Sequence, residues 1–85
     1  MVIEPNDLRA AAEEFKSAEL QLGEIVKKLD DVTTDLKGKW EGASQQVFYK
    51  EYETLRGYME IFGKVVNEIS TEMHGLADRF EAADQ

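Results

Sequence analysis

Apolar residues in the first half of the chain recur at alternating spacings of three and four. The series consists of Leu8, Ala11, Phe15, Ala18, Leu22, Ile25, Leu29, Val32 and Leu36. Such spacing places all its members in one narrow stripe of an α-helix, as in coiled coils. Pro5 suits the first turn of this helix, and Asn6 and Asp7 suit its N-terminal cap. The pattern predicts a helix over about residues 6–37.

The same spacing returns in the second half of the chain. This series consists of Phe48, Tyr52, Leu55, Met59, Phe62, Val66, Ile69, Met73, Leu76, Phe80 and Ala83. A half-buried strand would alternate at every second residue instead. The pattern therefore predicts a second helix over about residues 44–83.

Between the two predicted helices lies the only tryptophan, Trp40, flanked by Gly38 and Gly42. Glycine serves where the backbone must leave helical geometry. A tryptophan ring at such a corner can pack against the end of one helix and the start of the next. We therefore assign Trp40 and Gly42 to a turn over residues 38–43, in which the ring of Trp40 fixes the angle of the chain reversal.

Folding the chain back at this turn brings the two apolar series together. From Leu8 with Met73 to Val32 with Phe48, the residue numbers of each pair sum to 80 or 81, as antiparallel pairing requires. The predicted fold is all-α: an antiparallel helical hairpin forming a single domain over residues 1–85. In this register the segment 76–84 lies beyond most of the first helix, which makes it a candidate recognition element.

Two helices that share one seam bury little apolar surface, and both flanks of the second helix offer more contact area. Apolar residues lie together on one flank, and small residues repeat every seven positions on the other. The candidate dimer-interface residues from these flanks are Tyr58, Ile61, Val65, Gly63 and Ala77. The predicted assembly is a four-helix bundle of two hairpins. The alternative is that the apolar members are scattered surface residues, which are common.

Composition excludes several classes of protein. The chain has no cysteine and one histidine, which argues against a disulfide framework and against a metal site. Its net charge of -8 argues against direct binding to nucleic acid or to an anionic membrane surface. The N-terminus lacks the basic and apolar segments of a cleavable signal peptide, and no stretch is expected to span a bilayer.

Nothing in the sequence points to catalysis. The carboxylates are spread along the polar faces, no serine or threonine has a suitable histidine partner, and no glycine pattern resembles a phosphate-binding loop. His74 and Asp78 stand four residues apart, but we expect both on a solvated face. We therefore expect a protein that is not an enzyme and that binds no cofactor.

The turn Trp40-Glu41-Gly42 between two amphipathic helices resembles the Trp-x-Gly (WXG) family, the early-secreted-antigen-like substrates of type VII secretion. The resemblance covers essentially the whole chain. The opening Glu4-Pro5-Asn6-Asp7-Leu8 and the residues Phe48 and Tyr52 look like the Firmicutes branch. The resemblance to that branch implies a homodimer. The alternative is a heterodimer with another WXG-like chain or with the N-terminal domain of a toxin.

The family also has a C-terminal export pattern, in which an acidic residue follows a hydrophobic residue after three others. Phe80-Glu81-Ala82-Ala83-Asp84 matches the core of this pattern, with Phe80 as the hydrophobic residue and Asp84 as the acid. A spacing of four puts both side chains on one helix face. The further hydrophobic positions of the longer pattern are missing after Gln85, which leaves open a shortened sequence, a shorter family member, or a partner chain that carries the complete signal.

The resemblance implies a small non-enzymatic protein that is cytoplasmic before export and is secreted by a type VII system without a cleavable signal peptide. It would contact the secretion ATPase, act through protein–protein contacts and assist the export of other substrates. An alternative is a targeting adaptor that binds the helical N-terminal domain of a larger toxin and supplies part of the export signal. A third is a cytosolic coiled-coil structural protein in which the tryptophan turn is coincidental.

Overall fold

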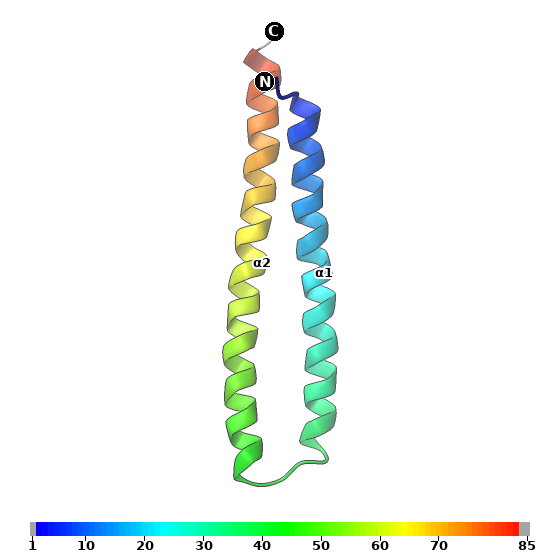
Figure 1. Cartoon of the computed structure of the whole chain (residues 1–85), viewed down its shortest axis with the longest axis vertical. Coiled ribbons are helices and arrows are strands. Elements are labelled where there is room, and N and C mark those ends of the chain that lie inside the picture. The colour runs from blue at the N-terminus through cyan, green and yellow to red at the C-terminus, as the bar shows by residue number, and fades with distance from the viewer. Residues whose placement is uncertain (1, 84–85) are drawn as a thin grey trace.

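The protein is a hairpin of two long antiparallel helices, which confirms the predicted fold (Figure 1). A computed structural model describes residues 2–83, in which α1 spans Pro5–Lys37 and α2 spans Ala43–Ala83. The molecule measures 66 × 19 × 16 Å, and its radius of gyration is 19.3 Å. A compact domain of this length would have a radius of gyration of about 12 Å. The hairpin is therefore a rod that is only two helices thick.

The first helix begins at Pro5, one residue before the predicted start, and its N-cap residue is Glu4 instead of Asn6 or Asp7. Pro5 is the first helical residue, and the backbone N–H of Glu4 donates a hydrogen bond to the carboxylate of Asp7 at 3.0 Å. Proline is favoured here because the first helical N–H has no partner within the helix. The carboxylate of Asp7 also lies at the positive end of the helix dipole, where negative charge is stabilising.

Trp40 joins the end of α1 to the start of α2. Its backbone N–H donates to the carbonyl of Leu36 at 2.9 Å, and its indole N–H donates to the hydroxyl of Ser44 at 3.2 Å. The ring centroid lies 5.4 Å from that of Phe48. The side chain is half-buried, so the ring closes the corner while one part of it faces solvent.

The two glycines beside Trp40 differ in what they do. Gly42 has a φ of 113°, a backbone conformation that L side chains rarely adopt. Gly38 has a φ of -81° and a ψ of -10°, which any residue adopts. Only Gly42 is therefore required by the backbone of the turn.

The two helices meet along a seam that differs from the predicted one at several positions of each helix. Leu8, Phe15, Leu22, Leu29 and Leu36 of α1 are half-buried, as predicted. The other α1 positions of the observed seam are Ala12, Glu19, Val26 and Thr33, each one residue after the predicted Ala11, Ala18, Ile25 and Val32. In α2 the seam likewise uses Arg56, Gly63, Ser70 and Ala77 in place of Leu55, Phe62, Ile69 and Leu76. Each helix is therefore rotated about its own axis relative to the prediction.

Small residues explain this rotation. The hydroxyl of Ser70 donates a hydrogen bond to the carbonyl of Ala12 at 2.8 Å, which brings the two helices close together. At Gly63, a methyl group in the Cβ position would lie 3.4 Å from a methyl group of Leu22. Ala12 and Ala77 are both completely buried. The helices pack through their small-residue flanks, because dispersion contacts and the hydrogen bond both require short separations.

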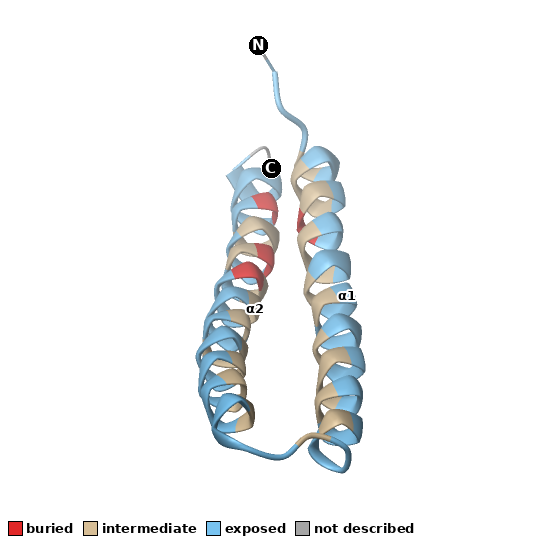
Figure 2. Ribbon diagram, turned by 60° about the horizontal axis from the view of Figure 1, so that its bottom comes forward, coloured by how far each residue is buried: buried red, intermediate tan, exposed pale blue. Residues whose placement is uncertain are grey.

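The hairpin has almost no core of its own. The buried residues among those described are Ala12, Val66, Ser70 and Ala77, and they lie in the half of the hairpin near the termini (Figure 2). No large side chain in the described chain is completely buried. Burial of apolar surface is the main favourable term in folding, so an isolated hairpin has little to stabilise it.

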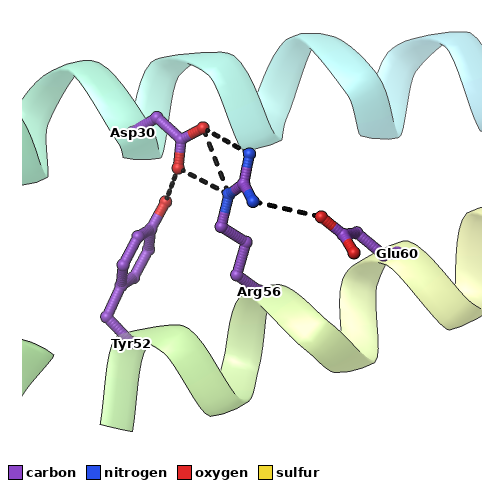
Figure 3. A network of polar contacts seen from close by, with 4 residues as sticks. All are labelled: Asp30, Tyr52, Arg56 and Glu60. Atoms are coloured by element: carbon purple, nitrogen blue, oxygen red, sulfur yellow. Dashed lines mark hydrogen bonds and ion pairs between the residues drawn. The ribbon is translucent and has the colours of Figure 1, made fainter. Parts of the chain in front are cut away.

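A polar network ties the helices together in the half near the turn (Figure 3). The carboxylate of Asp30 on α1 accepts hydrogen bonds from the hydroxyl of Tyr52 at 2.5 Å and from Nε of Arg56 at 3.0 Å. Arg56 also donates to Glu60 at 3.1 Å. The bond from Tyr52 and then the Arg56 guanidinium hold the pKa of Asp30 below its ordinary value. Desolvation, followed by the bond to Asp30, raises the pKa of Tyr52.

The contrast between the two glycines gives a paired test. We expect Gly42→Ala to lower the free energy of unfolding by about 1–2 kcal/mol, because a side chain is strained at positive φ. Gly38→Ala should be neutral or stabilising by up to about 1 kcal/mol, since its backbone is already helical and alanine restricts the unfolded chain. Urea melts followed by circular dichroism measure both, and equal losses at the two positions would contradict the assignment.

The Asp30 network predicts a pH-dependent stability. A carboxyl whose pKa is lower when folded stabilises the protein above its unfolded pKa of about 4, and this contribution is lost as the pH falls through the folded pKa. Asp30→Asn should therefore lower the melting temperature at pH 6 and have a shrinking effect below pH 4. Asp31→Asn at the neighbouring exposed position, which lies outside the network, is the control and should leave the melting temperature at pH 6 nearly unchanged.

Candidate interaction surfaces

The rotation of the helices leaves large apolar side chains uncovered. We call them the apolar face, and its members are Ala18, Ile25 and Val32 of α1 with Leu55, Tyr58, Phe62, Val65 and Leu76 of α2. Phe62 is 61% exposed, Tyr58 68% and Val32 58%. Single exposed apolar residues are ordinary, but a continuous patch of them marks an interaction surface.

These residues lie on the same side of the hairpin. In both helices each member precedes a seam residue by one position, as Ile25 precedes Val26 and Phe62 precedes Gly63. Both helices are right-handed and they run in opposite directions. Equal offsets in sequence therefore turn both stripes toward the same side. The apolar face thus extends across both helices.

The opposite side of the hairpin carries the polar contacts between the helices, and we call it the polar edge. Its contacts join Arg9 to Asp78 and Glu81, Glu13 to His74, Lys16 to Asn67, and Asp30 to Tyr52 and Arg56. Most of these residues follow a seam residue by one position. The described hairpin is therefore two-sided, with polar pairs on one side and uncovered apolar side chains on the other.

The structure separates the candidate dimer-interface residues into two groups. Tyr58, Ile61 and Val65 are 68%, 63% and 45% exposed and remain available to a partner. Ala77 is completely buried in the single chain, and Gly63 is half-buried with a methyl group of Leu22 close by, so both lie toward the seam with α1. Bulky stripes that filled the seam would leave the small residues outside the hairpin, which is why the spacing alone favours them as contacts with a second chain.

Part of the predicted overhang at the end of α2 is covered by α1. Ser70 contacts Ala12, and Tyr49 donates to the carbonyl of Thr33, so facing residues have numbers that sum to 82. In this register Ala77 lies opposite the first residue of α1, and it is completely buried. The uncovered part of α2 therefore begins after Ala77 and not at Leu76, which is itself only 37% exposed.

The two residues of the predicted export signal lie at this end of the molecule. Phe80 is 42% exposed, and Asp84 lies outside the described residues. Trp40 and Gly42 lie in the turn between α1 and α2, at the opposite end of the rod (Figure 1). The structure thus does not bring the turn motif and Phe80 together within one chain.

Arg9 is a functional candidate that the sequence analysis missed. Its guanidinium donates to Asp78 at 3.1 Å and to Glu81 at 2.5 Å, and these bonds raise the pKa of Arg9. The expectation that His74 and Asp78 only face solvent is wrong in part, since His74 also contacts Glu13 at 3.1 Å. Contacts between residues about seventy positions apart leave no periodic signal in the sequence.

Polar side chains line a groove of the described hairpin. The groove on the polar edge has a volume of about 530 Å³, and its walls include Asp30, Tyr52 and Arg56. These groups already bond one another. Within residues 2–83 no three potential metal ligands of the histidine, cysteine or carboxylate type are grouped together. Neither described helix is apolar over a stretch long enough to cross a bilayer.

Charge is distributed unevenly along the rod. The half near the termini, residues 1–20 and 64–85, contains ten acidic and four basic side chains. The half near the turn, residues 21–63, contains eight acidic and six basic side chains. A partner that lies along the rod therefore meets a stronger negative potential near the termini than near the turn.

Comparison with known proteins agrees with this architecture. YukE of Bacillus subtilis is 28% identical over 83 residues, which are 98% of this chain and 86% of that protein. A protein of Staphylococcus aureus named type VII secretion system extracellular protein A is 24% identical over 81 residues, which are 95% of this chain and 84% of that protein.

Solved structures of other proteins also match the hairpin. The crystal structure of the secreted protein EsxB from Bacillus anthracis matches with a TM-score of 0.92 and 28% identity, over 100% of this chain and 97% of that chain. EsxA of Geobacillus thermodenitrificans matches with a TM-score of 0.88 and 30% identity, over 100% and 91%. A family model described as proteins of 100 residues with WXG matches residues 1–85, which confirms the resemblance based on Trp40 and Gly42. The chain therefore belongs to the WXG100 family.

Proposed function

We propose that this protein is exported by a type VII secretion system as a homodimer and acts through protein–protein contacts. The observation that carries the proposal is the apolar face, which two helices share and which nothing within residues 2–83 covers. The names of its relatives support the export step, since they include a type VII secretion system extracellular protein and a secreted protein. The protein then has no catalytic task, and its working surface is the outside of the bundle.

A second copy of the chain is the occupant that best fits the apolar face. Two hairpins packed face to face form a four-helix bundle, in which Phe62, Tyr58 and Val65 gain the burial that they lack in one chain. Most closed dimers are two-fold symmetric, so the face must be complementary to itself. Phe62 and Val65 lie close to residue 63, the midpoint of α2, where a two-fold axis would pass.

Charge favours an antiparallel arrangement of the two hairpins. In that orientation the strongly acidic half near the termini of one chain lies beside the more balanced half near the turn of its partner. A parallel arrangement would set the two strongly acidic halves side by side, which is unfavourable. The antiparallel dimer also places the Trp40 turn of one chain near the Phe80 end of the other. The turn motif and the candidate export signal then share each end of the bundle.

In this proposal the secretion ATPase contacts the end of the bundle that presents Phe80 and Asp84. The protein is cytoplasmic before export and leaves without a cleavable signal peptide. A role in assisting the export of other substrates fits the same surface, because a dimer carries one such end for each chain. The adaptor alternative assigns the apolar face to the helical N-terminal domain of a toxin instead of a second copy.

The dimer can be tested with single cysteines, since the chain has none of its own. We expect Val65→Cys on the apolar face to be cross-linked efficiently between chains by a short bifunctional thiol reagent. Lys64→Cys is the matched control. Residue 64 is adjacent along the helix but turned toward the polar edge, so this variant should not be cross-linked between chains. Light scattering of the unmodified protein at micromolar concentration should report about twice the 9.7 kDa chain mass.

A helical monomer by light scattering would overturn the homodimer and favour the adaptor. Equal cross-linking at positions 64 and 65 would show that the chains associate through a surface other than the apolar face.

Export can be tested by replacing the two residues of the candidate signal. We expect Phe80→Ala with Asp84→Ala to abolish the appearance of the protein in the culture supernatant, while the dimer and the helix content are retained. Leu20→Ala is the control, because Leu20 is 61% exposed but lies outside the apolar face and the terminal segment. Normal secretion of the double variant would place the signal elsewhere, in this chain or in a partner.

A further inference from the structure

Arg9 reaches from the second turn of α1 to the last described turns of α2. In the observed register Arg9 faces Met73, so Asp78 and Glu81 lie five and eight residues further along α2. At 1.5 Å per residue these offsets are about 8 and 12 Å. Helical side chains lean toward the N-terminus of their own helix. Because the helices are antiparallel, Arg9 leans toward the end of α2 while both carboxylates lean back toward Arg9.

The segment 78–83 has little else to hold it. Ala77 is the last buried residue of the described part of α2, and all six residues after it are exposed. Within residues 2–83, the hydrogen bonds between α1 and this segment are both made by Nη2 of Arg9. The other guanidinium nitrogen, Nη1, donates to Asn6 at 3.1 Å, which fixes the arginine to its own helix.

The two contacts fix the rotation of the terminal turns as well as their position. Asp78 and Glu81 are three residues apart, so they lie on the same side of α2. Phe80 is turned away from them by roughly 160° and 100°, at 100° per residue. When Arg9 is hydrogen-bonded to both carboxylates on the polar edge, the ring of Phe80 is directed toward the side of the apolar face.

We propose that Arg9 is a positioning residue for export: it holds residues 78–83 in helical register and presents Phe80 to the secretion machinery. This inference rests on the proposed function for its consequence in export. The restraint that Arg9 places on residues 78–83 is independent of that function. The specificity of the contact comes from one cation shared by two carboxylates three residues apart, a geometry that a single exposed ion pair lacks.

Hydrogen exchange of the full chain tests the restraint directly. In Arg9→Gln we expect the backbone amides of residues 78–83 to exchange about two- to fivefold faster, the range that exposed ion pairs support. The amides around Val66 should be unchanged. Arg79→Gln is the matched control, because Arg79 is an arginine at the same end whose side chain lies against Gly75 of its own helix. It should leave exchange in the segment unaltered.

Rescue separates a specific contact from a general loss of charge. Arg9→Glu combined with Asp78→Arg and Glu81→Arg reverses every partner, so it should restore slow exchange, whereas Arg9→Glu alone should not. Export should be low in the variants whose residues 78–83 exchange fast. It should therefore be reduced in Arg9→Gln and recovered in the reversed triple variant. Unchanged exchange in Arg9→Gln, or fast exchange in the triple variant, would overturn the restraint.

The two proposals fail in different ways. Fast exchange in Arg9→Gln with undiminished export would overturn the positioning role. If the Phe80→Ala and Asp84→Ala variant is also exported normally, the proposed export signal itself has failed, while the exchange result still stands for the restraint. If that variant is not exported and Arg9→Gln is, only the positioning role is lost.

Discussion

The close approach of the two helices at their small residues determines most of what this molecule presents to its surroundings. Ala12, Gly63, Ser70 and Ala77 allow the backbones to come near enough for a hydroxyl–carbonyl hydrogen bond of 2.8 Å between helices. Bulky residues at these positions would force the helices apart. Because the small flanks are turned inward, the large apolar side chains are turned outward, where only a second molecule can cover them.

This arrangement divides the hairpin into two sides with different tasks. On the polar edge, pairs such as Asp30 with Arg56 hold the helices in register and are satisfied within the chain. Each carries modest stability because its side chains remain partly exposed to solvent, but together they specify which residues face one another. The apolar face differs from the polar edge in both respects. It makes no directional contacts, and its burial would be strongly favourable. Register is therefore set inside one chain, and the proposed dimer would supply the burial that one chain lacks.

The two ends of the rod complete the division. At one end the positive φ of Gly42 and the half-buried ring of Trp40 close the chain reversal. At the other, α2 continues past the first residue of α1, and Arg9 is the described residue that reaches across to it by hydrogen bonds. Because α2 is the longer helix, its last described turns extend beyond the start of α1 and have no helix beside them in the single chain. In an antiparallel dimer, each such end would lie next to the turn of the partner.

The sequence by itself determined the two helices, the antiparallel turn at Trp40 and Gly42, and the family, because heptad spacing and turn chemistry are local properties. It also determined that apolar surface would exceed what one hairpin can bury. Only the tertiary structure decided which stripe of each helix lies in the seam and which lies on the surface. Gly63 and Ala77 lie in the seam, and Ile25 and Phe62 lie on the surface. The same spacing serves either rotation of a helix, and the choice depends on the distance between backbones. Arg9 and its two carboxylates were likewise beyond the sequence, since their meeting depends on the register of residues about seventy positions apart.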